Sequence, residues 1–212
     1  MKTLIILAAL ILSLSAHAED KYYVVFGQSN AGGIANYGKL DEKLSTATDT
    51  AHIIPCWKGG TELSKFMPSY DIVSIYGECL KKIGTNKISG IVFWQGERDA
   101  SRLTEVGTKT PAATNWMGRI TTIIRTLRQD INQGNIPVVV VLMNDKAHTK
   151  TFPYWKSIRN LQQRISAPNV MKVDSSPYEF NNDACYPGDA IHLTETGYEA
   201  ISMEISAQLT TK

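Results

Sequence analysis

The chain has 212 residues, of which 43% are hydrophobic and 20% are charged, and its formal net charge is +2. This composition is typical of a globular protein and excludes a disordered, collagen-like or low-complexity chain. The sequence contains no basic tract, so we expect no nucleic-acid partner. Beyond the leader described next, no segment is long and apolar enough to predict stable membrane insertion.

The first 18 residues have the pattern of a secretory signal peptide. Lys2 precedes an unbroken apolar run over residues 4–12, and residues 16–18 form an A-x-A end of the kind that is cleaved. The apolar run is too short to span a bilayer. We therefore expect a signal peptide over residues 1–18, export to the periplasm or the exterior, and a single domain over residues 19–212.

Three cysteines lie in the part that is predicted to be exported: Cys56, Cys79 and Cys185. In an oxidising compartment they allow one disulfide and one free thiol, and the sequence leaves all three pairings open. No C-x-x-C pair or cysteine–histidine cluster of the zinc type occurs. We therefore expect neither a metal ion nor another cofactor.

Strand and helix patterns alternate along the rest of the chain. In chain order they predict strands over residues 22–26 and 52–56, a helix over 69–84, a strand over 88–94, a helix over 111–134, a strand over 137–143, a helix over 153–165, a strand over 170–173 and a helix over 195–209. Residues 31–50 and 98–110 have the polar composition of long connections.

Apolar strands that alternate with amphipathic helices predict an α/β fold, in which a parallel sheet is covered on both faces. We expect a three-layer α/β/α sandwich with a flavodoxin-like five-stranded parallel sheet in the order 2-1-3-4-5. In such folds the ligand binds beyond the carboxyl ends of the strands. Polar residues directly after predicted strands are therefore the candidates for chemistry.

The first predicted strand runs into Gly27-Gln28-Ser29-Asn30-Ala31. A serine on a tight turn after a buried strand stands at the carboxyl edge of the sheet, and the N–H groups of a following helix would point at the group that it attacks. Ser29 is therefore a candidate nucleophile, although the segment lacks the second glycine of the G-x-S-x-G elbow. Alternatively, Ser29 or Asn30 caps a helix.

Two further strand ends carry groups that could assist a nucleophile. The third predicted strand ends in Gln95-Gly96-Glu97, an amide that can donate to an oxyanion and a carboxylate that can support a base. After the second predicted strand, Gly60 offers a backbone N–H that no side chain shields. The alternative for residues 95–97 is a polar strand end with a surface ion pair. The alternative for Gly60 is an ordinary glycine turn.

A histidine near the C-terminus is the candidate for the general base that activates the serine. In the segment from Gly188 to Thr194, Asp189 stands three residues before His192. A carboxylate this close can hold the Nδ1–H of the imidazole and leave Nε2 for a serine. The alternative is a surface histidine beside an acidic loop.

Together the four segments resemble the SGNH hydrolase superfamily, and within it the branch of carbohydrate acetylesterases and sialate O-acetylesterases. The resemblance implies a flavodoxin-like fold and metal-free hydrolysis of esters by a serine. It implies that Ser29 is the nucleophile, His192 the base and Asp189 the carboxylate that orients it. It also implies an oxyanion hole made by the N–H groups of Ser29 and Gly60 and by the Gln95 amide.

Glu97 is a second candidate for the carboxylate that supports His192, because some esterases of this branch use that glutamate instead. Spacing favours Asp189, and Glu97 would then order the neighbouring loop. The chain departs from the branch at Arg98, where a small polar residue is common.

The sequence thus predicts an exported serine esterase that removes O-acetyl groups from a carbohydrate such as sialic acid, xylan or another polysaccharide. The alternatives are a lysophospholipase or thioesterase of the same superfamily, and a non-catalytic glycan-binding protein of this fold. The expected partner is an acetylated carbohydrate substrate. The particular sugar and the oligomeric state are left open.

Overall fold

The computed structural model describes residues 18–69, 71, 73–102, 111–145, 152–180 and 191–211, with the backbone alone for residues 102 and 111–115. Residues 1–17 of the predicted signal peptide lie outside the described residues, as do Cys185 and Asp189.

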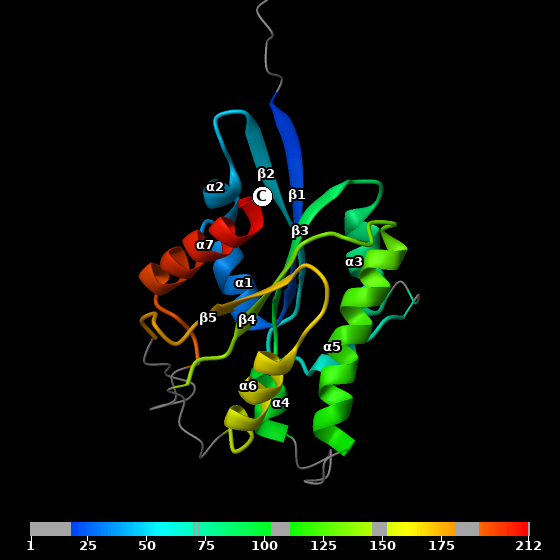
Figure 1. The fold of residues 1–212 in the computed structure, drawn as a ribbon, viewed down its shortest axis with the longest axis vertical. Coiled ribbons are helices and arrows are strands. Elements are labelled where there is room, and N and C mark those ends of the chain that lie inside the picture. The colour runs from blue at the N-terminus through cyan, green and yellow to red at the C-terminus, as the bar shows by residue number, and fades with distance from the viewer. Residues whose placement is uncertain are drawn as a thin grey trace, which may run out of the picture.

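One parallel sheet of five strands forms the centre of the fold, in the order β2-β1-β3-β4-β5 (Figure 1). The strands are β1 (Glu19–Gly27), β2 (Asp49–Trp57), β3 (Ile88–Trp94), β4 (Val138–Leu142) and β5 (Val170–Asp174). All neighbouring pairs are parallel. The predicted α/β class and strand order are confirmed. The apolar strand β4 lies between two others and is buried along its whole length.

Helices cover both faces of the sheet (Figure 1). One face carries α1 (Ser29–Asn36), α2 (Leu40–Leu44) and α7 (Glu195–Thr210). The other carries the 3-10 helix η1 (Leu63–Phe66), α3 (Ile75–Ile83), α4 (Glu97–Arg102), α5 (Pro111–Asp130) and α6 (Trp155–Arg164). None of the helices in the described ranges is long and apolar enough to cross a membrane.

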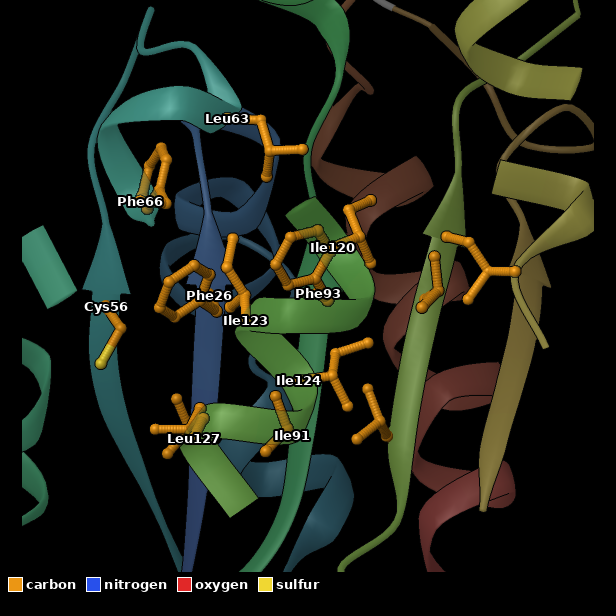
Figure 2. Close-up of a cluster of buried hydrophobic side chains, with 14 of the residues drawn as sticks. Phe26, Cys56, Leu63, Phe66, Ile91, Phe93, Ile120, Ile123, Ile124 and Leu127 are labelled. Atoms are coloured by element: carbon orange, nitrogen blue, oxygen red, sulfur yellow. The ribbon is translucent and has the colours of Figure 1, made fainter. Parts of the chain in front are cut away.

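Alternation along the strands builds a separate hydrophobic core on each face, because successive side chains point to opposite sides of a sheet. In β1, Val24 and Phe26 face one core, whereas Tyr23 and Val25 face the other. In the first core Phe26 stacks on Phe93, with ring centroids 5.5 Å apart. Figure 2 shows these rings against apolar side chains of α5: Ile120, Ile123, Ile124 and Leu127.

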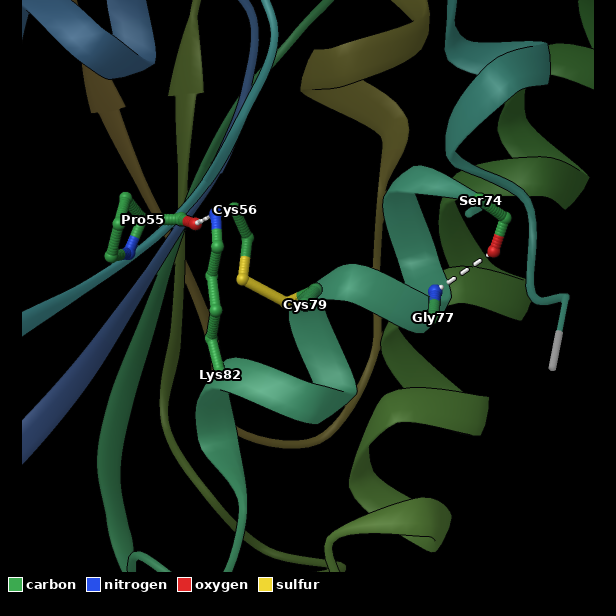
Figure 3. Close-up of a disulfide and its surroundings, with 6 residues drawn as sticks. All are labelled: Pro55, Cys56, Ser74, Gly77, Cys79 and Lys82. Atoms are coloured by element: carbon green, nitrogen blue, oxygen red, sulfur yellow. Dashed lines mark hydrogen bonds between the residues drawn. A yellow bond between two sulfur atoms is a disulfide. The ribbon is translucent and has the colours of Figure 1, made fainter. Parts of the chain in front are cut away.

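Three segments differ from the sequence-based prediction. The connection expected over residues 98–110 begins inside α4, a helix that was not predicted. The polar connection expected over residues 31–50 contains α1 and α2. The small buried residues of α1 produce no apolar stripe of helical period, so the pattern missed this helix. Helix α3 begins at Ile75 rather than at residue 69, because the Ser74 hydroxyl caps it by accepting from the Gly77 N–H at 2.9 Å (Figure 3).

A disulfide joins Cys56 of β2 to Cys79 of α3, which is one of the three pairings that the sequence left open (Figure 3). Close to it, the Lys82 ammonium donates to the Pro55 carbonyl at 2.8 Å. The disulfide and this hydrogen bond hold α3 against β2. These contacts therefore keep the segment that follows β2, from Lys58 onward, near the start of α3 at Ile75.

Candidate active site

Ser29 reaches the edge of the sheet because β1 ends in a glycine. Gly27 has a φ of 143°, and a Cβ there would lie 1.8 Å from the Trp94 carbonyl oxygen. That same carbonyl accepts the Gln28 N–H at 3.2 Å, which fixes the turn. Ser29 is the first residue of α1, and its N-cap is Gln28 without a side-chain cap. The structure thus does not support the alternative in which Ser29 or Asn30 caps the helix.

The Ser29 hydroxyl meets the imidazole of His192, although the two residues are 163 positions apart. Their Oγ and Nε2 atoms lie 2.9 Å apart, within hydrogen-bonding distance. The backbone that follows His192 is anchored at Thr194. The Thr194 N–H donates to the Glu179 carbonyl at 3.0 Å, and the Thr194 hydroxyl caps α7. A neutral imidazole in this position can take the hydroxyl proton.

A cavity of about 180 Å³ opens beside this pair, and its lining includes Ser29, Gly60, Glu97, Arg98 and His192. The glycine loop approaches closely, since a Cβ on Gly59 would lie 3.9 Å from the Cβ of Ser29. Neither the Ser29 N–H nor the Gly60 N–H donates to another described residue. Two backbone N–H groups without a partner thus belong to residues that line the cavity next to the hydroxyl–imidazole pair. Such N–H groups can stabilise an oxyanion.

The buried side chain of Asn30 connects the segments that supply Ser29 and His192. Its Nδ2 donates to Oε1 of Glu97 at 2.7 Å and to the carbonyl of Ile191 at 2.9 Å. Its Oδ1 accepts from the Tyr198 hydroxyl at 2.6 Å. Both amide hydrogens and the amide oxygen are thus used, and they tie α1 to α4, to the residue before His192 and to α7.

Glu97 is buried beside the cavity, and its carboxylate bonds to Asn30 rather than to His192. Burial raises the pKa of the Glu97 carboxyl, while the Asn30 hydrogen bond and the nearby His192 act in the opposite direction. Its Oε2 has no hydrogen-bond partner in the described part of the chain. Of the two carboxylates predicted to support His192, Glu97 is thus not hydrogen-bonded to it, and Asp189 lies outside the described residues.

The Gln95 amide occupies a different place from the one expected. Its Nε2 donates to the Thr61 carbonyl at 2.8 Å and to Oδ2 of Asp99 at 3.1 Å. Both hydrogens of this fully buried amide are thereby satisfied, and Gln95 does not line the cavity. The structure therefore brings together Ser29, Gly60, Glu97 and His192, but it does not direct the Gln95 amide at the oxyanion position.

Asp99 completes the attachment of the glycine loop to the end of β3. Its carboxylate accepts from the Leu63 N–H at 3.0 Å as well as from Gln95. The loop that carries Gly60 is thus held at Thr61 and at Leu63. Burial raises the pKa of the Asp99 carboxyl to about 6 against the effect of these hydrogen bonds.

Sequence reasoning missed Asp99 and gave Asn30 no role beyond a possible cap. The spacing in the sequence could have identified Asp99, because it follows Gln95 by four residues, a separation at which two side chains can meet at the start of a helix. No local signal exists for Asn30, because its partners come from residues 97, 191 and 198. Among the described residues, no group of three or more His, Cys, Asp or Glu side chains is placed to hold a metal ion.

The raised pKa of Asp99 predicts a pH-dependent contribution to stability. Its folded-state pKa of about 6 exceeds the 3.8 of an unperturbed aspartate, so the folded protein holds this proton more tightly than the unfolded chain. The contribution is present below pH 4 and is lost as the pH rises through 6, by about 3 kcal/mol. Urea unfolding of the wild type and Asp99→Asn should show the variant gaining relative stability between pH 4 and pH 7.5. A stability difference that stays constant with pH would contradict this account.

The sequence of this chain matches a known protein family. The model of the family described as carbohydrate esterase, sialic acid-specific acetylesterase matches residues 42–211. That range contains Gly60, Glu97 and His192 and begins after Ser29. No curated protein matches the chain in sequence.

Several solved structures share the fold at TM-scores of 0.61: a protein from Arabidopsis thaliana with 20% identity, a carbohydrate acetylesterase from Xanthomonas citri with 14% and a lipase from a goat rumen metagenome with 17%. The alignments cover 83%, 82% and 89% of this chain, respectively. The chain spans 65% and 40% of the first two proteins and 97% of the third. The resemblance noted from the sequence motifs is confirmed, and the chain belongs to the carbohydrate esterase family of sialic acid-specific acetylesterases.

Proposed function

We propose that the chain is an exported serine esterase that removes O-acetyl groups from a carbohydrate. The observation that carries this proposal is the 2.9 Å contact between Ser29 Oγ and His192 Nε2, beside a cavity with two unused backbone N–H groups. Membership of a carbohydrate esterase family supports the same reaction class.

In the first half of the reaction, Ser29 Oγ attacks the acetyl carbonyl carbon while His192 Nε2 takes the hydroxyl proton. The carbonyl oxygen becomes an oxyanion, to which the N–H groups of Ser29 and Gly60 donate. Removing one such donor typically costs about 3–4 kcal/mol of barrier. The tetrahedral intermediate then expels the sugar oxygen, which receives the proton from His192, and an acetyl-Ser29 ester remains.

In the second half, a water molecule gives a proton to His192 Nε2 and attacks the acetyl carbon. The new intermediate collapses to acetic acid, which releases its proton to the solvent, and the proton on His192 returns to Ser29 Oγ. We assign Gln95 to positioning in both halves, because its amide and Asp99 hold the loop that carries Gly60.

The size of the cavity favours an acetyl group over a long acyl chain. About 180 Å³ accommodates the reacting atoms and a short acyl group, and is less than the 300–1,000 Å³ that is usual for drug-sized ligands. This observation favours an acetylesterase over a lysophospholipase, which needs an apolar channel for its acyl chain.

The proposal of export rests on the leader pattern of residues 1–18 and on the Cys56–Cys79 disulfide. Structural disulfides persist in oxidising compartments such as the periplasm and the exterior.

Replacing Ser29 by alanine tests the proposal. Hydrolysis of 4-nitrophenyl acetate and release of acetate from acetylated xylan and acetylated sialic acid should fall at least about a thousandfold, because the nucleophile is lost. Ser89→Ala, at the opposite edge of the sheet, is the matched control and should keep full activity. More than a tenth of the activity remaining in Ser29→Ala, or a wild type that binds glycans without turnover, would reject a serine esterase.

A pair of isosteric variants tests which carboxylate supports His192. We propose Asp189, because Glu97 is bonded to Asn30 instead. Asp189→Asn should lower kcat far more than Glu97→Gln, with little change in KM; loss of the equivalent charge in a serine protease costs about ten-thousandfold. The opposite ranking of the two kcat values would assign the role to Glu97.

A further inference from the structure

Gln28 is a buried residue whose side-chain amide lines the cavity beside Ser29. It is the N-cap residue of α1 and directly precedes Ser29. Only 2% of its surface is exposed, yet it belongs to the lining of the cavity together with Ser29, Gly60 and His192. The polar atoms of its amide therefore either have partners within the protein or face the cavity.

A contact with α4 determines which end of the Gln28 amide is free. The amide Oε1 accepts the backbone N–H of Arg98, in the first turn of α4, through a long hydrogen bond of 3.4 Å. A backbone N–H is a donor only, so it faces the amide oxygen rather than the amide nitrogen. The Nε2 group lies on the other side of the amide carbon, and its two hydrogens are donated to no residue that the structure describes.

A buried amide with unused hydrogens is unusual, because most buried polar groups have a partner and one without a partner costs about 1–3 kcal/mol. The two other buried amides near the cavity follow this rule. Asn30 Nδ2 and Gln95 Nε2 each donate two hydrogen bonds within the protein. Among the described residues that line the cavity, Gln28 is the single side-chain amide, and its hydrogens are available to a bound molecule.

The ester oxygen that becomes negatively charged is the acceptor that best suits the Gln28 amide. An oxyanion can accept three hydrogen bonds, and the N–H groups of Ser29 and Gly60 supply two of them. Gln28 and Ser29 are consecutive residues at the start of α1, so the Gln28 side chain and the Ser29 N–H belong to the same helix end. A donor that is held in place beforehand stabilises the charge as it develops.

We propose that the Gln28 side-chain amide is the third donor of the oxyanion hole, in the role that the sequence motif suggested for Gln95. The inference rests on the proposed esterase function and adds a catalytic residue to it. When Ser29 Oγ bonds to the acetyl carbon, the electron pair of the carbonyl double bond moves to the oxygen, and Gln28 Nε2–H donates to that oxygen. No proton leaves the amide. The same hydrogen bond forms again when water attacks acetyl-Ser29.

Two substitutions separate the oxygen of this amide from its nitrogen. Gln28→Glu keeps an oxygen that can accept the Arg98 N–H but has no donor at pH 8.5, far above the usual glutamate pKa of about 4.3. Gln28→Met removes both groups. On 4-nitrophenyl acetate at this pH, kcat should fall about a hundredfold or more in both variants, with KM nearly unchanged. Gln129→Met, which replaces an exposed amide in the last turn of α5, is the matched control and should keep the wild-type kcat.

Other roles of Gln28 give different results in the same assay. A wild-type kcat in Gln28→Glu together with a low kcat in Gln28→Met would show that the oxygen matters and that Gln28 only positions α4, which would overturn the proposal. A raised KM for an acetylated sugar, with an unchanged kcat on 4-nitrophenyl acetate, would assign the amide to the sugar and would also overturn it. Absence of hydrolysis by the wild type would reject the esterase function itself, whereas wild-type hydrolysis that both Gln28 variants retain would reject only the role of Gln28.

Binding of methylboronic acid gives a readout that does not depend on turnover. The boron atom bonds to a serine Oγ and forms a tetrahedral adduct, in which a hydroxyl oxygen takes the place of the oxyanion. The dissociation constant measured by calorimetry should rise at least about tenfold in both Gln28 variants and stay unchanged in Gln129→Met. Urea unfolding identifies which Gln28 variants fold cooperatively. A folded Gln28 variant with the wild-type dissociation constant would overturn the proposal.

Discussion

The hydrogen bonds of the Asn30 side chain are the constraint on which the geometry of the site depends. Ser29 and His192 come from opposite ends of the chain, and no strand pairing joins the segments that carry them. Asn30, directly after Ser29, instead donates to the carbonyl that precedes His192. Because the amide is buried and each of its polar atoms is bonded, displacing one partner would leave an unsatisfied group in the interior, at a cost of about 1–3 kcal/mol. The need to keep the buried Asn30 amide hydrogen-bonded therefore fixes the position of the imidazole relative to the hydroxyl.

A second buried network gives the glycine loop the same kind of support. Gln95, which follows β3, and Asp99 in α4 bond to Thr61 and Leu63, and so hold the loop directly after Gly60. The loop borders the cavity at Ser29, since Gly60 is part of the lining of that cavity. The proposed oxyanion donor at Gly60 is thus positioned by this scaffold. Within this scaffold the Gln95 amide donates to Thr61 and Asp99, whereas its motif suggested a direct role in the oxyanion hole.

The sequence predicted the parts of the fold that depend on local apolar patterns. The five strands and the long helices were recognisable because each buries a continuous run or a stripe of helical period. Helix α1 was missed because its buried residues are small and give no such stripe. The motifs identified Ser29, Gly60 and His192, which the structure brings to one cavity. The contact of the Gln95 amide with Thr61 and the partners of Asn30 could not be predicted, because these contacts join residues that are 34 to 168 positions apart. The disulfide pairing could not be predicted for the same reason, since it depends on how α3 packs on β2.

The most direct test of this account is the turnover of Asn30→Ala compared with Tyr198→Phe on 4-nitrophenyl acetate. Alanine at position 30 removes the hydrogen bonds to Glu97, to the Ile191 carbonyl and to Tyr198, whereas Tyr198→Phe removes only the last of these. If Asn30 positions His192, kcat should fall at least about tenfold in Asn30→Ala with KM nearly unchanged, and much less in Tyr198→Phe. A cooperatively folded Asn30→Ala protein with the wild-type kcat would show that the Ser29–His192 contact is maintained by other means.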